Sequence, residues 1–168
     1  MSTPSVFVLD SNVFMEASRR YYAFDLVPAF WEVLADQAMN GRVLSVDRVR
    51  DEIARGQDAL TDWANGNFRE WFASTDGPDV LEAYRQLMTW ANSHTQFTRA
   101  AVAEFAQQRN ADAWVVAFSM ARTHTVVTHE QFDPNVRRRV PIPNVCQHFD
   151  VHYLDTFRML RDLSVRLS

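Results

Sequence analysis

Short apolar segments that alternate with helical segments restrict the fold of this chain more than any other feature of its sequence. The first segment reads Val-Phe-Val-Leu and ends at Asp10. A short apolar run bounded by polar residues is typical of a buried strand. This pattern predicts four strands, at 6–9, 43–46, 125–128 and 144–146. Strands that alternate with helices favour an α/β domain, in which helices cover both faces of a parallel sheet.

Periodic apolar residues between these strands predict helices. In 25–40, Phe30, Leu34 and Ala38 recur every four residues, and Gly41 follows as a stop signal. Further helices are expected at about 47–55, 58–72, 79–93, 98–108, 112–124 and 153–166. Because we find neither an internal repeat nor a linker, we expect residues 1–168 to form one domain.

The composition excludes several classes of enzyme. All 17 residues counted as lysine or arginine are arginine. The absence of lysine excludes P-loop nucleotide hydrolases, Schiff-base enzymes and kinases, which need a catalytic lysine. It also disfavours haloacid-dehalogenase-type phosphatases and response-regulator receivers. The four glycines form no G-x-G-x-x-G motif, so a dinucleotide-binding Rossmann site is not expected.

Other features bear on where the protein resides. Cys146 is the single cysteine and cannot form an internal disulfide, which fits a reducing compartment. The N-terminal residues lack the basic and apolar regions of a signal peptide. No apolar run reaches the roughly 18 residues that a membrane span needs. We therefore expect a soluble cytoplasmic protein with no membrane partner.

Acidic residues lie near the ends of the predicted strands. Because ligands of parallel sheets bind beyond the carboxyl ends of the strands, Asp10, Glu52, Asp112 and Glu130 are candidates for one site. Three of them have a structural alternative: a helix cap for Asp10, a rim carboxylate for Glu52 and a favourable helix dipole for Asp112. Together, however, such carboxylates cannot all stay ionised without cations. Oxygen-only ligands suit Mg²⁺ or Mn²⁺.

A second acidic residue competes with Glu130 for the fourth position. Asp133 also follows the strand 125–128, but it precedes Pro134, which favours an extended or turn conformation. Glu130 is closer to the strand end and is the preferred candidate.

The order of these motifs resembles that of PIN-domain nucleases over essentially the whole chain. The resemblance rests on VFVLDSNV at 6–13, the central Glu52, NADA at 110–113 and VVTHE at 126–130. More narrowly, YYAFD at 21–25, PAFW at 28–31 and IPNVC at 142–146 resemble a bacterial PIN-like family of unknown function. That family is similar to VapC-type toxins of toxin–antitoxin pairs.

The resemblance implies a three-layer α/β/α fold with sheet order 3-2-1-4-5 and Mg²⁺- or Mn²⁺-dependent cleavage of RNA. The family's acidic positions fall on Asp10, Glu52, Asp112 and Glu130, where many PIN domains have aspartate at the fourth. Its supporting polar positions fall on Ser11, Asn12 and Thr128. The implied partners are RNA and an antitoxin protein, and a homodimer remains an open alternative.

Other residue groups have weaker assignments. Arginine contacts phosphate and stacks on bases, so we interpret Arg137, Arg138, Arg139, Arg19 and Arg20 as candidate RNA contacts or, alternatively, as solvated residues. His148 and His152 have the spacing of a metal pair on a helix, but no third ligand is evident. Four tryptophans in helical patterns are expected in the core or an interface: Trp63, Trp71, Trp90 and Trp114.

Three functions follow from these observations. The first is a metal-dependent endoribonuclease that acts as a toxin held by an antitoxin. The second is a housekeeping RNA-processing nuclease of the same type. The third is a catalytically silent module that binds protein or RNA, which the intact acidic positions disfavour.

Overall fold

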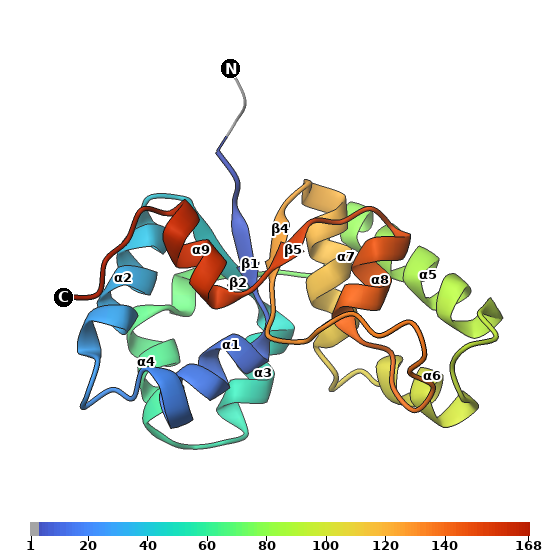
Figure 1. Ribbon diagram of the computed structural model, residues 1–168, viewed down its shortest axis with the longest axis horizontal. Helices are drawn as coiled ribbons and strands as arrows, with labels where there is room; N and C mark the ends of the chain where they lie inside the picture. The colour runs from blue at the N-terminus through green and yellow to red at the C-terminus, as the bar shows by residue number, and fades with distance from the viewer. Residues whose placement is uncertain (1–3) are drawn as a thin grey trace.

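A short parallel sheet forms the centre of the molecule (Figure 1). The computed structural model describes residues 4–168. The sheet order is β3-β2-β1-β4-β5, and every neighbouring pair is parallel. The strands are β1 (Phe7–Leu9), β2 (Val43–Val46), β3 (Phe72–Ala73), β4 (Thr125–Val127) and β5 (Tyr153–Leu154). This order is the one that the PIN resemblance implies, and it places β1 between β2 and β4.

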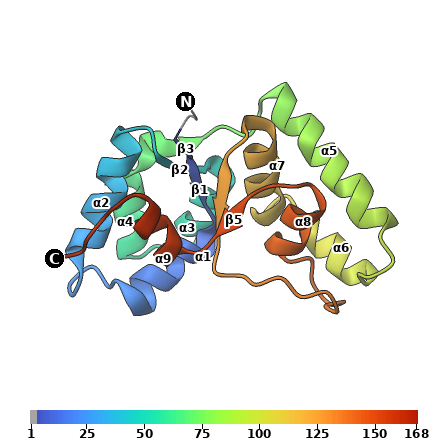
Figure 2. The same ribbon diagram turned by 45° about the horizontal axis from the view of Figure 1, so that its top comes forward.

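Helices flank the sheet on both sides, as the strand–helix alternation predicts. Figures 1 and 2 show α1, α2, α4 and α9 on one side and α5, α6, α7 and α8 on the other. The helical elements are α1 (Ser11–Glu16), the π-helix η1 (Ala17–Tyr21), α2 (Pro28–Met39), α3 (Asp47–Ala54), α4 (Ala59–Asn67), the 3-10 helix η2 (Arg69–Trp71), α5 (Pro78–Ser93), α6 (Arg99–Phe105), α7 (Asp112–Arg122), α8 (Ile142–His148) and α9 (Thr156–Asp162). None of them, within residues 4–168, is long and apolar enough to cross a membrane.

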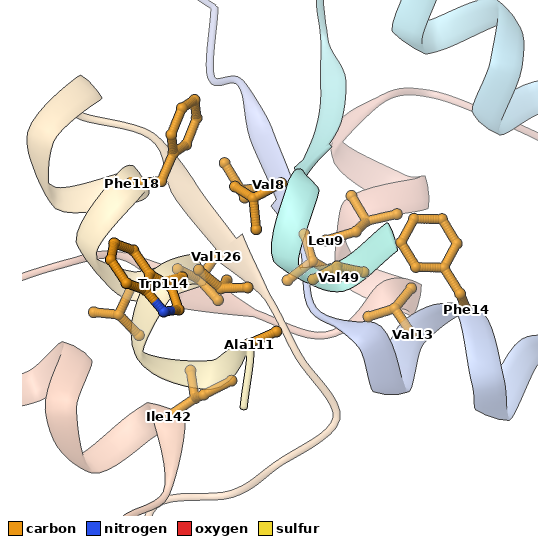
Figure 3. Close-up of a cluster of buried hydrophobic side chains, with 14 of the residues drawn as sticks. Val8, Leu9, Val13, Phe14, Val49, Ala111, Trp114, Phe118, Val126 and Ile142 are labelled. Carbon is orange, nitrogen blue, oxygen red and sulfur yellow. The ribbon is translucent and has the colours of Figure 1, made fainter. Parts of the chain in front are cut away.

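The core lies on both sides of β1. Successive strand residues point to opposite faces. Val8 accordingly lies toward Phe118 of α7, whereas Leu9 lies toward Val13 and Phe14 of α1 (Figure 3). All five side chains are buried. Because both faces of β1 are covered by apolar groups, the strand has the continuous hydrophobic sequence of a central parallel strand.

The expected strand at 144–146 is wrong, because these residues belong to α8. Ile142, Val145 and Cys146 are buried at helical spacing, and Pro143 occupies the first turn, where the missing N–H costs little. A short apolar run does not by itself distinguish a buried helical turn from a strand.

Two edge strands, β3 and β5, lie where the sequence predicts helix. Each pairs over two residues only, β3 with β2 and β5 with β4. The predicted helix 58–72 is divided into α4 and η2 before β3, and the predicted helix 153–166 begins only at Thr156. The carboxylate of Asp155 accepts the Arg158 N–H at 2.8 Å and caps α9 there.

Candidate metal centre

Three carboxylates converge at the carboxyl end of the sheet. Asp10 directly follows β1, Asp112 is the first residue of α7, and Glu130 follows β4. One carboxylate oxygen from each lies within 4.8 Å of the other two. They meet because β1 and β4 are parallel neighbours that end at the same sheet edge. The structure thus brings together three of the four acidic residues that the sequence singles out.

Asp10 is fully buried and is held by hydroxyl groups. The Thr128 hydroxyl donates to Asp10 Oδ2 at 3.1 Å, and the Ser11 hydroxyl lies 3.4 Å from Asp10 Oδ1. Asp10 occupies the N-cap position of α1, yet its side chain makes no capping hydrogen bond. The carboxylate is therefore directed to the acidic cluster instead of to the start of the helix.

Thr128 connects two members of the cluster. Besides donating to Asp10, its hydroxyl oxygen accepts the backbone N–H of Glu130 at 3.1 Å. Thr128 is itself buried, and its N–H donates to the Leu154 carbonyl of β5. These contacts match a supporting role for this residue. Asn12, by contrast, is exposed on α1 and has no hydrogen bond to the carboxylates in the described residues.

Glu52 lies beside the cluster but makes a different contact. Its Oε1 accepts the backbone N–H of Ala111 at 2.8 Å and lies 4.0 Å from Arg55. It is not among the three carboxylates that come within 4.8 Å of one another. Glu52 therefore fixes the start of α7 and, through it, the position of Asp112.

Asn110 is a positioning residue whose contact sequence reasoning missed. Its side-chain oxygen accepts the Asp112 N–H at 3.0 Å, and its amide donates to the Glu104 carbonyl at 3.1 Å. An Asn just before an apolar helix is a common capping signal, and this signal could have identified the contact.

The cluster strongly disfavours its own negative charge. Burial raises the pKa of Asp10 from 3.8 to about 7, and the charge of Glu130 raises it too. The hydrogen bond from Thr128 acts in the opposite direction and lowers this pKa. Burial likewise raises the pKa of Asp112 well above its usual value, and the charges of Asp10 and Glu130 add to that effect. A bound cation would relieve both penalties.

Arg139 supplies one positive charge at the edge of the cluster. Its guanidinium forms a close ion pair with Glu130, and this pairing opposes the effect of burial, which raises the pKa of Glu130. Arg139 and Asp112 also line a cavity of about 330 Å³ together with Glu104 and Asn110. The sequence groups Arg139 with its two neighbours as RNA contacts, but the structure turns its side chain toward the carboxylates.

Asp133 lies outside the cluster. Its N–H donates to Asn144 Oδ1 at 3.1 Å, its carbonyl accepts the Asn144 amide at 2.8 Å, and its carboxylate accepts the Asn135 N–H at 2.9 Å. These bonds make Asp133 an exposed turn residue.

The other four arginines that the sequence suggests as RNA contacts are exposed. The two candidate histidines do not lie on one helix. Arg137 and Arg138 lie exposed in the loop after Glu130, and Arg19 and Arg20 are exposed in η1. Arg20 lies 3.7 Å from Glu16. His148 ends α8 and His152 lies beyond it, so the two histidines do not share a helix.

The tryptophans are core residues, as predicted. Trp63 and Trp114 are buried, and Trp71 and Trp90 pack partly buried against the core. His148 stacks on Trp90 with 4.8 Å between ring centroids, which accounts for its position.

Comparisons with known proteins agree with the observed fold and identify the family of the chain. The crystal structure of FitAcB from Neisseria gonorrhoeae is similar over 89% of this chain and 96% of that chain, with a TM-score of 0.55 and 17% identity. This likeness and the sheet order confirm the PIN-like fold. No curated protein sequence matches the chain. A family model described as a domain of unknown function (DUF4411) matches residues 7–167, and the chain therefore belongs to this family.

Proposed function

We propose that this protein is an endoribonuclease that depends on Mg²⁺ or Mn²⁺. The convergence of Asp10, Asp112 and Glu130 within 4.8 Å is the observation that carries the proposal. The donor set consists of oxygen atoms only, which hard divalent ions prefer. Burial and the neighbouring carboxylate charges raise the pKa values of Asp10 and Asp112, and a bound cation would offset both effects. The residues present therefore fit such an ion.

Asp10 and Asp112 would hold the principal ion, and Glu130 would complete the site or hold a second ion. Such an ion supplies an activated water and stabilises the leaving oxygen of a phosphodiester. Thr128 orients Asp10 and Glu130 through its two hydrogen bonds, and Glu52 and Asn110 fix the start of α7. A second role of Glu52, in orienting the nucleophile, is part of the same proposal.

The cysteine near the cluster is not suited to act as the nucleophile in place of water. Cys146 is buried, and burial raises the pKa of its thiol far above its usual range. The thiol therefore stays protonated at neutral pH and is a poor nucleophile. Attack by water is consistent with this environment.

Removal of the metal should abolish the proposed activity. The protein treated with a chelator should not cleave a labelled single-stranded RNA, and added Mn²⁺ or Mg²⁺ should restore cleavage. A calorimetric titration of the same sample with Mn²⁺ should detect binding independently of catalysis. Full activity of carefully demetallated protein would contradict the metal-dependent mechanism.

Glu130→Gln should impair metal-dependent cleavage more than Asp133→Asn. Glu130 belongs to the carboxylate cluster, whereas Asp133 contributes to a turn. We expect at least about a tenfold loss of Mn²⁺ affinity or rate for Glu130→Gln, in the range for disturbed metal sites, and little change for Asp133→Asn. Mn²⁺ titration and initial cleavage rates measure both. Greater damage in a folded Asp133→Asn protein would reverse the assignment.

Arginine substitutions should separate RNA contact from cluster electrostatics. Arg137→Gln with Arg138→Gln should weaken RNA binding and flatten its salt dependence, by about 0.7 in log–log slope for each phosphate that is no longer neutralised. Arg139→Gln should instead tighten Mn²⁺ binding, because it removes the cation that pairs with Glu130. Fluorescence anisotropy at several salt concentrations and Mn²⁺ titration distinguish the two. An unchanged salt slope would assign Arg137 and Arg138 to solvent or to a protein partner.

The resemblance to VapC-type toxins supports a biological role as the toxin of a toxin–antitoxin pair. On this proposal an antitoxin protein holds the nuclease inactive, and a second copy of the chain is an alternative partner. The competing role is RNA processing without toxicity. The gene next to this one distinguishes them most simply, because an antitoxin gene is expected there only for a toxin.

A further inference from the structure

Three phenylalanine or tyrosine side chains are exposed in the described part of the chain. Tyr21, Phe132 and Phe157 are 50%, 41% and 40% exposed. Tyr21 ends η1, which follows β1 through α1; Phe132 lies two residues after Glu130; and Phe157 lies in the first turn of α9, after β5. Each of these residues thus lies in a segment that comes after β1, β4 or β5 in the chain.

Two of these rings form one cluster with His129. The ring of Tyr21 stacks on that of His129, with 6.0 Å between centroids and 29° between planes. Phe157 meets Tyr21 edge-on at 5.9 Å and lies 6.3 Å from His129. His129 Nε2 lies 2.9 Å from the Thr156 hydroxyl, which fixes the imidazole. We call Tyr21, His129 and Phe157 the aromatic platform.

The aromatic platform is connected to the acidic cluster through the backbone of His129. His129 stands between Thr128 and Glu130, both of which belong to the hydrogen-bond network around Asp10. The other side of the metal centre has the cavity lined by Asp112 and Arg139 beside α6. Figure 1 shows α1 and α9 on one side of the β4 end and α6 on the other.

Charges of both signs lie beside the aromatic platform. The carboxylates of Asp155 and Glu16 act on His129, and Arg20 lies 3.7 Å from Glu16. The arginines of η1 are the groups that suit a nucleic acid. Arg19 and Arg20 are exposed in the same π-helix that ends in Tyr21. Exposed arginines bind phosphate, while flat aromatic faces bind bases of any identity by stacking. A purely apolar partner surface would gain nothing from the two arginines.

We propose that the aromatic platform is a subsite that stacks one unpaired base of the RNA next to the phosphate that is cleaved. This inference rests on the proposed nuclease function and refines it, because it makes single-stranded or looped RNA the substrate. Bases in a duplex are already stacked on one another and cannot be inserted without unpairing. Arg19 and Arg20 contact the phosphates that flank the stacked base.

Substitutions that keep apolar bulk but remove the flat ring test this subsite. Tyr21→Leu and Phe157→Leu should each weaken binding of single-stranded RNA about tenfold, in the range for loss of base–aromatic stacking. Tyr21→Phe should bind like the unchanged protein. Leu81→Ala is a matched control, because Leu81 is 47% exposed on α5, away from the platform. Binding is measured by anisotropy in chelator, so that no cleavage occurs.

A fluorescent base locates the stacked position. Oligonucleotides that carry 2-aminopurine at successive positions should show quenching at one position with the unchanged protein, and Tyr21→Leu should remove that quenching. An abasic site at the same position should weaken binding to the unchanged protein but not to Tyr21→Leu.

These experiments distinguish a failure of the stacking subsite from a failure of the proposed nuclease function. If the unchanged protein cleaves RNA with Mn²⁺ while both leucine variants bind and cleave equally well, the stacking subsite is wrong and the nuclease proposal stands. Equal binding of duplex and single strand also overturns the subsite. If the unchanged protein neither binds nor cleaves RNA, the nuclease proposal fails, and the platform is then better explained as a contact for a protein.

Discussion

Asp10→Asn and Asp112→Asn should each reduce metal-dependent RNA cleavage by more than about a hundredfold, because loss of residues that only support metal ligands already costs 10–100-fold. Asparagine keeps the size of aspartate but removes the charge that the ion needs. Asp10 is buried and Asp112 is partly buried, and the uncharged side chain is easier to bury than the carboxylate. The variants should therefore remain folded while losing Mn²⁺ binding.

Circular dichroism, Mn²⁺ calorimetry and initial cleavage rates measure these effects together. Asp51→Asn is a matched control, since Asp51 is exposed on α3. A folded Asp10 or Asp112 variant that stays within a few-fold of the unchanged protein would show that the residue is not a ligand. In cells, the toxin proposal adds that the unchanged protein arrests growth and that Asp10→Asn relieves the arrest. Harmless expression of protein with verified activity would favour the RNA-processing role.

The metal-free protein should lose stability as the pH rises from about 4 to about 7. The pKa of Asp10 is raised from 3.8 to about 7 in the fold, chiefly by burial. Between these values the folded protein keeps a proton that the unfolded chain has lost, so the free energy of unfolding falls with increasing pH. At about 1.36 kcal/mol per pKa unit, Asp10 alone accounts for a loss of up to about 4 kcal/mol. Asp112, whose pKa is shifted in the same direction, adds to the slope.

Urea unfolding in chelator at several pH values measures this slope. Asp10→Asn should reduce it and make the metal-free protein more stable than the unchanged protein at pH 8. Saturating Mn²⁺ should stabilise the unchanged protein most at high pH, where the carboxylates are free of protons, and should not stabilise Asp10→Asn to the same extent. A flat stability profile in chelator would mean that the carboxylates are hydrated in the folded protein and would contradict this prediction.

The sequence predicts the members of the acidic cluster whose positions follow from the ends of strands and the start of an apolar helix. Asp10 and Glu130 follow apolar runs whose parallel pairing brings them to one edge, and the helix that starts at Asp112 is long and apolar. Glu52 shows the limit of such reasoning. Its direct contact is the N–H of Ala111, a donor that α7 itself leaves unsatisfied. Only the tertiary structure, which brings Glu52 of α3 to the start of α7, reveals this contact.

The errors in the predicted elements have a common physical cause. The strands β3 and β5 contain two residues each, too few for any periodicity to be visible, and they form because β2 and β4 offer free edges. The run around Val145 is buried as a helical turn for the same reason: neighbouring elements, not the local pattern, decide its conformation. The ion pair of Arg139 with Glu130 likewise depends on how the loop 128–141 returns across the sheet edge.

The hydrogen bond from Thr128 to Asp10 joins residues that are 118 positions apart. Contacts of such long range form late, because the intervening chain must first be brought together. During synthesis on the ribosome, the growing chain carries Asp10 and Glu52 well before Thr128 and Glu130 have been made. A nascent chain therefore lacks the neighbour β4 and cannot complete the carboxylate cluster. If the protein is a toxin, translation itself delays its activity, and this delay gives a co-expressed inhibitor time to bind.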